Sequence, residues 1–444
     1  VNYAASLAGR VPVNLNYTLS AEALGSCIEQ CNIRTVVTSK AFLEQIKLDV
    51  PVETILLEDV AKSIGVGSKL AAVLASALLP VGLLEKFLGS KRRASMDDLA
   101  TVIFSSGSTG EPKGVMLSHY NVVSNIQQIG QAFALDRHDR ILGILPFFHS
   151  FGFTGTLWLP PLLGSGAVYH PNPVDGRGIG ELVCEHRATF LLATPTFLQI
   201  YIRACTPEQF GSVEFVLAGA EKLPERLAAA YEDRFGLRPM EGYGTTETSP
   251  VVTINTRDFR SAGFRQVGAK RGSIGHPLPG MVARFVDPDT GEPVALGQPR
   301  LLLVKGPNVM QRYLGQAQKT AEVLRDGWYT TGDIAAMDAD GFLAITDRLS
   351  RFSKIGGEMV PHIKVEENLH ELGGLTEQTF AVTGVPDERK GERLVVLYQN
   401  LDESAVQSIA EKITASDLPN IWKPRSDQFF KVEALPYLGT GKLD

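Results

Sequence analysis

The segment Ser105–Gly114 reads Ser-Ser-Gly-Ser-Thr-Gly-Glu-Pro-Lys-Gly and follows the apolar run Leu99–Phe104. Small residues let a backbone approach a phosphate closely, backbone N–H groups and hydroxyls can donate to it, and Lys113 adds a positive charge. A flexible glycine–serine linker is the alternative, but we expect this segment to join a buried strand to an amphipathic helix, where linkers are rare. The spacing does not fit the Walker A pattern, which disfavours an ordinary P-loop nucleotide hydrolase or kinase. The segment therefore predicts a phosphate-binding loop of another kind.

Three further motifs carry residues suited to nucleotide chemistry. They are Glu241-Gly-Tyr-Gly-Thr-Thr-Glu247, Tyr329-Thr-Thr-Gly-Asp333 and Gly439-Thr-Gly-Lys442. Taken alone, Tyr243 is a core aromatic, Asp333 a turn residue and Lys442 a solvated charge near a chain end. It is their combination and order that favour function.

The four motifs together resemble the adenylate-forming superfamily of acyl-CoA synthetases, luciferases and peptide-synthetase adenylation domains. Within it, Pro12–Tyr17 and Arg351–Pro361 resemble the acyl-acyl-carrier-protein synthetase family, the synthetase part of 2-acylglycerophosphoethanolamine acyltransferases. The resemblance implies two half-reactions: ATP activates a carboxylate as an acyl-adenylate, and a thiol then displaces AMP. It also implies ATP and Mg²⁺ as cofactors.

The resemblance assigns roles residue by residue. The signature loop would hold the β- and γ-phosphates, Tyr243 would stack on adenine, Asp333 would accept both ribose hydroxyls, and Glu247 would hold Mg²⁺. The full nucleotide-binding set is Ser105, Ser106, Gly107, Ser108, Thr109, Gly110, Lys113, Gly219, Ala220, Glu221, Gly242, Tyr243, Gly244, Thr246, Asp333 and Arg348.

Four residues are predicted to be catalytic by the same resemblance. Lys442 would bridge the substrate carboxylate and the phosphate, and Thr246 would donate to the α-phosphate. His149 would line the carboxylate entrance, although a satisfied buried histidine is the alternative. Lys354, beside Gly356-Gly357, would face the site during thioester formation, after a rotation about a hinge at Ser350.

Two positions depart from the family pattern. Arg300 and Arg312 stand where members usually have glycine. Because a glycine often marks positive φ or close packing, we expect the two arginines to distort these turns and to affect stability more than chemistry.

The elements that must position these residues follow from hydrophobic periodicity. Strand-like runs alternate with helical patterns up to about Gly280, which predicts α/β layers with largely parallel sheets; a more β-rich pattern follows. The predicted fold is α/β, in part α+β. Residues 1–349 would form a large adenylation domain with a β-rich subdomain at about 281–349, and residues 350–444 a small swivelling domain. The first residue, Val1, suggests a truncated start.

Composition narrows the partners and the compartment. The net charge is −6, so the overall charge of the chain does not favour binding to nucleic acid. Four cysteines are too few for a disulfide scaffold. We expect them to be reduced and to pack as small hydrophobic side chains in a reducing compartment. We therefore expect a cytoplasmic protein, and the family resemblance implies contact with the cytoplasmic face of the inner membrane.

The segment Lys69–Gly89 is apolar and precedes the basic run Lys91–Arg93. Its longest apolar stretch, Leu70–Leu84, contains Pro80 and Gly82 and falls short of the ~20 residues that a transmembrane helix needs. A helical hairpin packed on the large domain and a helix lying on an anionic membrane both fit it.

The substrate and the acceptor are less constrained by the residues. Phe147–Leu163 and Leu191–Ile200 would suit an acyl channel or plain core. The main hypothesis is a long-chain fatty acid ligase that charges acyl carrier protein; a long-chain fatty acid–CoA ligase is the alternative. A degenerate adenylate-binding or scaffolding module is the competing class.

Overall fold

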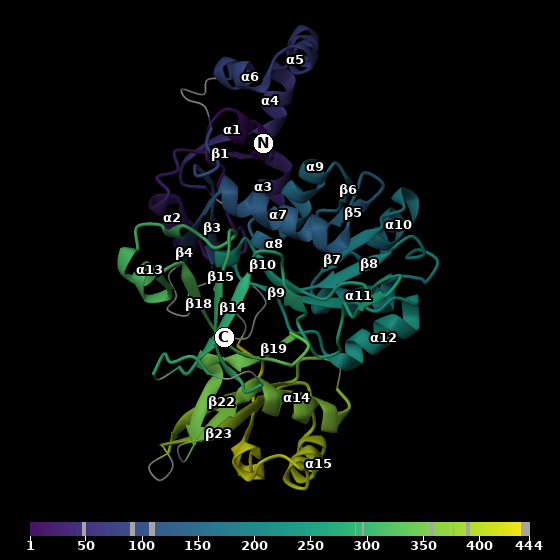
Figure 1. The fold of residues 1–444 in the computed structure, drawn as a ribbon, viewed down its shortest axis with the longest axis vertical. Helices are drawn as coiled ribbons and strands as arrows, with labels where there is room; N and C mark the ends of the chain where they lie inside the picture. Colours follow the sequence, from purple (N-terminus) through teal and green to yellow (C-terminus); the bar gives the residue numbers. More distant parts are fainter. Residues whose placement is uncertain are drawn as a thin grey trace. The chain divides into compact units, whose positions relative to one another are not determined.

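The computed structural model describes residues 1–46, 50–88, 94–105, 112–288, 290–294, 297–355, 358–375, 377–387 and 391–436. Of the predicted site residues, Ser106, Gly107, Ser108, Thr109, Gly110 and Lys442 lie outside these ranges, and the side chain of Lys354 is also not described. The chain divides into two compact units (Figure 1). Unit 1 comprises Val1–Pro171, Gly244–Val251 and Pro307–Arg325; unit 2 comprises Asn172–Tyr243, Val252–Gly306 and Asp326–Asp444.

Unit 1 contains the strands around the predicted phosphate loop. Strand β3 (Leu99–Ser105) pairs antiparallel with β4 (Lys113–Ser118), which pairs with β16 (Arg312–Tyr313). Ser118 then caps helix α7 (His119–Phe133), forming a reciprocal pair of hydrogen bonds with Asn121. The loop therefore joins two strands, whereas we expected it to join a strand to a helix; the helix follows after β4. The apolar run Val115–Leu117 is buried against β3 before the helix begins.

The rest of unit 1 surrounds this sheet with helices and two parallel strand pairs. These elements are α1 (Asn2–Leu7), α2 (Ala21–Gln30), β1 (Thr35–Thr38), α3 (Lys40–Ile46), β2 (Glu53–Leu56), β5 (Arg140–Gly143), α8 (Ser150–Gly152), the π-helix Phe153–Trp158, α9 (Leu159–Leu163), β6 (Gly166–Tyr169) and α13 (Ala317–Val323). Strand β1 pairs with β2, and β5 pairs with β6.

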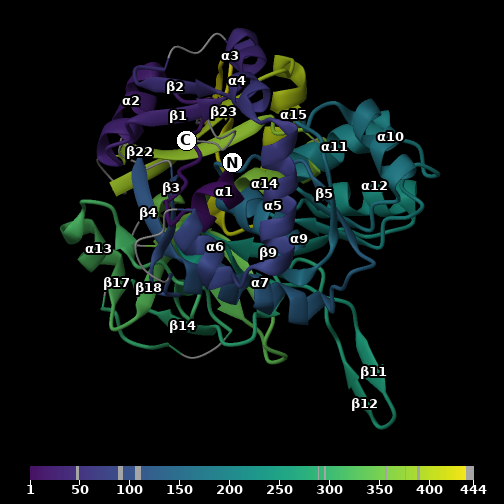
Figure 2. The same ribbon diagram turned by 90° about the horizontal axis from the view of Figure 1, so that it is seen from above.

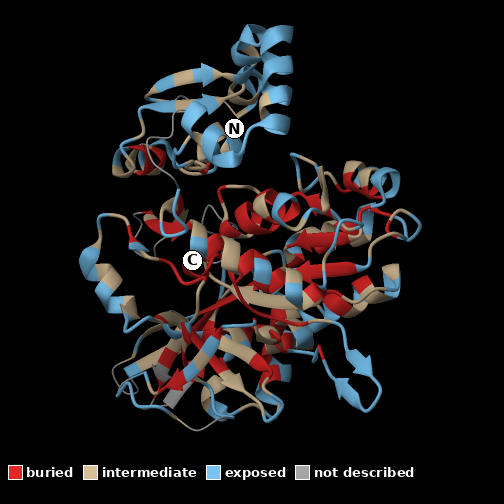
Figure 3. Cartoon of the chain, turned by 45° about the horizontal axis from the view of Figure 1, so that its top comes forward, coloured by how far each residue is buried: buried red, intermediate tan, exposed pale blue. Residues whose placement is uncertain are grey.

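A helical arm of unit 1 leaves its apolar side chains exposed. It consists of α4 (Leu57–Ser63), α5 (Val66–Leu78) and α6 (Val81–Phe87), and Figure 3 shows these helices almost entirely as exposed. Val66 is 84% and Phe87 82% exposed. One of our two predictions for this segment was a helical hairpin packed on the large domain. Such packing would bury these apolar side chains, which are instead exposed. Among the described residues no single helix is long and apolar enough to cross a membrane; α4 and α5, bent by 89°, pass that test only as a pair.

Unit 2 begins with the predicted alternation of helices and parallel strands. Strands β7 (Phe190–Ala193), β8 (Phe215–Ala218) and β9 (Met240–Gly244) run parallel, connected by helices α11 (Pro195–Ala204) and α12 (Glu225–Phe235) after α10 (Gly176–His186). After β10 (Val251–Ile254) comes the two-stranded hairpin β11 (Phe259–Ser261) and β12 (Phe264–Gln266), which projects as a narrow ribbon in Figure 2. All six residues of its strands are exposed.

The later part of unit 2 is rich in strands, as the change of pattern near Gly280 predicted. Strands β14 (Val282–Val286), β15 (Arg300–Lys305), β18 (Trp328–Met337) and β19 (Leu343–Arg348) follow one another in one sheet. Then come β20 (Phe352–Ile355), β21 (Glu358–Pro361), α14 (His362–Gly373), β22 (Phe380–Asp387), β23 (Gly391–Tyr398), α15 (Glu403–Thr414) and β24 (Phe429–Lys431). These C-terminal elements share a hydrophobic core that includes Val365, Phe380, Val396 and Ile413. The domain boundary at residue 350 stays a prediction.

Several detailed expectations can be compared with this fold. Arg300 lies in β15 and Arg312 in β16, and neither has positive φ, so the expected distortion of turns is wrong. Cys27 and Cys205 are buried, as small hydrophobes would be, but Cys184 is exposed; none of the four cysteines forms a disulfide. About half of the large apolar side chains of the two proposed channel runs, such as Phe153 and Leu198, are buried in the core.

Candidate nucleotide-binding site

The nucleoside part of the predicted site lies in unit 2. The Tyr243 hydroxyl, on β9, donates to Oδ2 of Asp333, on β18. Arg348 Nε lies 3.2 Å from the other carboxylate oxygen, Oδ1, and the two residues face each other across β18 and β19. Asp333 is only 4% exposed. The structure thus brings together three residues that the motifs only suggested separately.

The electrostatics of this group keep Tyr243 a neutral donor. Burial, reinforced by the neighbouring Asp333, holds the pKa of Tyr243 well above its usual range. A carboxylate has about four acceptor positions in all and can accept from a pair of hydroxyl donors. An adenosine ribose is a ligand with such a pair.

The loop after β8 forms a second element of the nucleoside part. Gly219 N–H donates to the Ala193 carbonyl at 3.1 Å, and Ala220 has φ of +70°, unusual for a residue with a side chain. The Glu221 carboxylate accepts from Thr196 Oγ1 at 2.8 Å. Gly219 is buried and Ala220 is exposed, which makes Ala220 the accessible residue of the predicted pair.

The phosphate and metal part of the predicted site lies in unit 1. Ser105 and Lys113 end the two strands that enclose the signature loop and pair with each other. Lys113 Nζ lies 5.7 Å from the centre of the Tyr313 ring, and the Tyr313 hydroxyl donates to Glu247 Oε1 at 2.8 Å. These contacts connect the predicted phosphate-binding lysine to the predicted metal ligand. Tyr313 was not predicted, because nothing in its local sequence marks it.

Glu247 sits on a short, well-supported turn. It belongs to the 3₁₀ turn Thr246–Thr248, is 8% exposed, and accepts at its backbone carbonyl from Met310 N–H at 2.7 Å. Asn308 Nδ2 donates to the carbonyls of Thr248 and Val251, at 2.6 and 2.9 Å. A buried, hydrogen-bonded framework of this kind holds the carboxylate in place. Asn308 was also missed by sequence reasoning.

The residues of this part fit a magnesium ion bound together with a phosphate substrate. Within the described ranges no cluster of three or more His, Cys, Asp or Glu side chains could hold a metal. Mg²⁺ in nucleotide sites commonly takes only one or two carboxylates and completes its shell with phosphates and water. A single buried carboxylate, Glu247, is such a donor set.

Close backbone packing explains why the Glu241–Glu247 motif has glycine at position 244. A Cβ atom there would lie 1.8 Å from the Pro250 carbonyl oxygen. Thr245 N–H donates to the same oxygen at 3.1 Å, so the two backbones are in close contact. Only glycine allows the turn that carries Thr246, which is half-buried, and Glu247 to fold back in this way.

The other predicted residues are placed less decisively. His149 is half-buried at the start of α8, with its ring 4.6 Å from that of Phe148. Gly242 lies within β9, and its added Cβ would come 3.2 Å from Leu217. The catalytic roles of His149, Thr246, Lys354 and Lys442 remain predictions.

Comparison with known proteins identifies a family that matches most of the chain. Residues 1–314 match the family described as AMP-binding enzyme. The chain is 35% identical over 355 residues to feruloyl-CoA synthase of Amycolatopsis sp, covering 78% of this chain and 69% of that protein. It is 33% identical over 357 residues to the long-chain-fatty-acid–CoA ligase of Bacillus subtilis (strain 168), covering 78% of this chain and 60% of that one.

Solved structures match the fold over the whole chain. ATP-bound MatB from Rhodopseudomonas palustris superposes with a TM-score of 0.80 at 25% identity, covering 100% of this chain and 84% of that one. The fold and the site define an adenylate-forming enzyme, an AMP-forming acid–thiol ligase of the kind that uses ATP and Mg²⁺. The chain belongs to the AMP-binding enzyme family.

Proposed function

We propose that this protein activates a long-chain fatty acid as its acyl-adenylate and transfers the acyl group to the thiol of coenzyme A. The observation that carries the proposal is the buried Asp333, held between the Tyr243 hydroxyl and Arg348 as a receptor for a ribose. Support for the acid and the acceptor comes from the relatives, which include long-chain-fatty-acid–CoA ligases at 30–33% identity. Acyl carrier protein is the alternative acceptor, favoured by the resemblance of Arg351–Pro361.

The proposed reaction has two balanced steps. A carboxylate oxygen of the acid attacks the α-phosphorus of ATP, and the bond to pyrophosphate breaks. The thiol sulfur then attacks the acyl carbon, the bond to AMP breaks, and the thiol proton is released. The first step gathers negative charge, so donors and cations such as Lys113 and Thr246 would lower its barrier. Mg²⁺ bound at Glu247 would supply further positive charge to the phosphate oxygens.

Lys442 and Lys354 would divide the two steps between them. We propose that Lys442 contacts the carboxylate and the α-phosphate during adenylation, with His149 beside the entrance for the acid. A rotation about residue 350 would then exchange Lys442 for the segment that carries Lys354 during thioester formation. Each lysine would therefore be needed for only one half-reaction.

Fatty-acid-dependent ATP–pyrophosphate exchange tests the adenylation step. Exchange with a series of saturated fatty acids, but not with ferulate, supports the proposed substrate; exchange with ferulate alone overturns it. Single-turnover transfer to coenzyme A and to holo-acyl carrier protein then separates the acceptors. If the folded protein exchanges with neither acid, a non-catalytic adenylate-binding module is the better description.

Lys442→Ala tests the division of labour. It should abolish exchange and spare transfer from supplied acyl-adenylate, whereas Lys354→Ala should do the reverse. Loss of both activities in either variant would contradict the proposal.

We also propose that the helical arm α4–α6 contacts an anionic lipid surface, where a fatty acid substrate would be concentrated. On α5 the exposed side chains of Val66, Leu70, Val73, Leu74 and Leu78 fall on one face of the helix, and Lys69 flanks them. Exposed apolar surface of this extent usually marks an interaction site.

Sedimentation with phosphatidylglycerol vesicles tests the lipid contact. Leu70→Ser/Leu74→Ser should release the protein, and the control Phe259→Ser/Phe264→Ser, on the exposed hairpin of unit 2, should not. Equal binding of all three proteins would refute it.

A further inference from the structure

Glu241 lies two residues before Tyr243 on β9 and joins β9 to the loop after β8. Its carboxylate oxygen Oε1 accepts from the backbone N–H of Leu223 at 3.2 Å. Leu223 lies two residues after the Gly219–Glu221 loop, so this hydrogen bond joins β9 to the segment that continues the loop. Our sequence reasoning assigned Glu241 no role.

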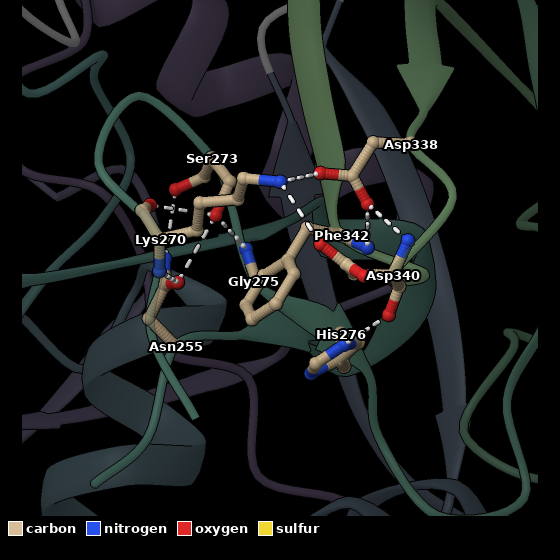
Figure 4. Close-up of polar contacts among 8 residues, drawn as sticks. All are labelled: Asn255, Lys270, Ser273, Gly275, His276, Asp338, Asp340 and Phe342. Carbon is tan, nitrogen blue, oxygen red and sulfur yellow. Dashed lines mark hydrogen bonds and ion pairs between the residues drawn. The ribbon is translucent and has the colours of Figure 1, made fainter. Parts of the chain in front are cut away.

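The backbone of Glu241 is fixed from the opposite side by Asn255. The Glu241 carbonyl accepts from Asn255 N–H at 3.1 Å and from Asn255 Nδ2 at 2.8 Å. Asn255 is itself held, because its Oδ1 accepts from Lys270 N–H and from Ser273 Oγ, both at 3.1 Å (Figure 4). Lys270 Nζ in turn pairs with Asp338 and Asp340. Asn255 therefore holds the backbone of β9 on one side, and the Glu241 carboxylate extends the contacts of this strand to the loop on the other.

Charges from two other elements act on the Glu241 carboxylate. Lys222, beside Leu223, and Glu367, on α14, form an ion pair, and Lys364 lies 3.5 Å from Glu367 on the same helix. Lys222 favours the ionised form of Glu241, and Glu367 disfavours it. Burial is the largest influence and raises the pKa of Glu241 to about 7.

We propose that Glu241 is a positioning residue that holds the Gly219–Glu221 loop against β9 and that Lys222 and Glu367 set how firmly it does so. An ionised acceptor makes a hydrogen bond roughly twice as strong as a neutral one. The contact to Leu223 therefore weakens as the pH falls through the pKa of Glu241. The loop would then have to be ordered by the nucleotide itself, which lowers affinity. This inference rests on nucleotide binding at this site and assigns the C-terminal helix α14 a part in it.

AMP binding measured by calorimetry over a pH range around 7 tests the inference without requiring turnover. Wild-type affinity should fall about two- to tenfold on acidification, the effect of weakening one hydrogen bond. Glu241→Gln, which replaces the carboxylate with an uncharged amide of the same shape, should remove the part of the pH dependence that comes from Glu241. The AMP phosphate itself titrates near pH ~6, so the Glu241→Gln profile is the baseline for every comparison.

Two further variants must move the midpoint of the profile in opposite directions. Lys222→Gln should raise it and Glu367→Gln should lower it, each by about one unit. The control variants Arg203→Gln and Glu377→Gln break a 2.9 Å ion pair elsewhere in unit 2 and should leave it unchanged. A Glu241→Gln profile identical to wild type, or Lys222→Gln and Glu367→Gln shifts of the same sign, would overturn the inference. Proteins that bind AMP normally but lack pyrophosphate exchange would count against the proposed function alone.

Discussion

Replacing Tyr313 with Phe tests whether the connection from Lys113 to Glu247 serves the reaction. The change removes one hydroxyl, which donates to Glu247 Oε1 at 2.8 Å, and keeps the ring that Lys113 faces. Hydrogen bonds to charged groups contribute about 1.5–3 kcal/mol, and leaving a buried acceptor without its donor costs a similar amount. If the hydroxyl orients Glu247 for the metal, this energy is lost from the adenylation transition state, which predicts a rate about 10- to 100-fold lower.

The assay is the Mg²⁺ dependence of ATP–pyrophosphate exchange. Tyr313→Phe should raise the Mg²⁺ concentration needed for half-maximal exchange as well as lower the rate. Tyr169→Phe is the matched control, because it removes a hydroxyl that donates to the Thr156 carbonyl at 2.8 Å in the same unit. An unchanged Mg²⁺ requirement in Tyr313→Phe, or an equal change in both variants, would refute the reasoning.

Three further predictions concern stability. Gly244→Ala should lower the free energy of unfolding by at least about 1–3 kcal/mol, because its Cβ would clash with the Pro250 carbonyl at 1.8 Å; Gly25→Ala, a helical site with no atom within 4 Å of the added Cβ, should be neutral or stabilising in the same thermal melt. Arg300→Gly, which introduces the residue usual in the family, should destabilise the protein by about 0.5–1 kcal/mol rather than relieve strain, since Arg300 is in an extended strand; an increase in melting temperature would show that the strand is strained after all. Asp347 is buried, which raises its pKa to about 6 from 3.8. A raised pKa means that the folded state binds the proton more tightly, so the stability from this group is present below pH ~4 and lost as the pH rises through 6. Asp347→Asn should therefore show a smaller loss of melting temperature than wild type across that interval, and parallel curves would contradict the assignment.

The nucleotide site shows where local sequence was sufficient. Ser105–Gly114, Glu241–Glu247 and Tyr329–Asp333 could be recognised because each segment carries small and polar residues at a fixed spacing along the sequence. Gly244 is an example, since its contact partner, Pro250, is only six positions away. The start of α7 is also a local feature, since Ser118 and Asn121 form the reciprocal hydrogen bonds of the cap within four consecutive residues.

Strand β4 shows where the local pattern was ambiguous. A short apolar run can continue into a helix or form a strand, and here pairing with β3 and β16 decided for a strand. The expectation for Arg300 and Arg312 was wrong for the same reason. Other family members usually have glycine at these positions, but here the pairing of β15 and β16 within their sheets sets an extended backbone that arginine can adopt.

The sequence by itself therefore determined the class of chemistry, since the motifs predicted to bind phosphate and ribose, with their glycines, are encoded within short segments. Tertiary structure alone decided that Tyr313 donates to Glu247 across 66 positions and that Asp333 meets Tyr243 across 90. It also decided that the apolar arm α4–α6 stays exposed and that Lys222 meets Glu367. The physical reason is that burial and charge pairing depend on which distant segments pack together, and no local spacing records that choice.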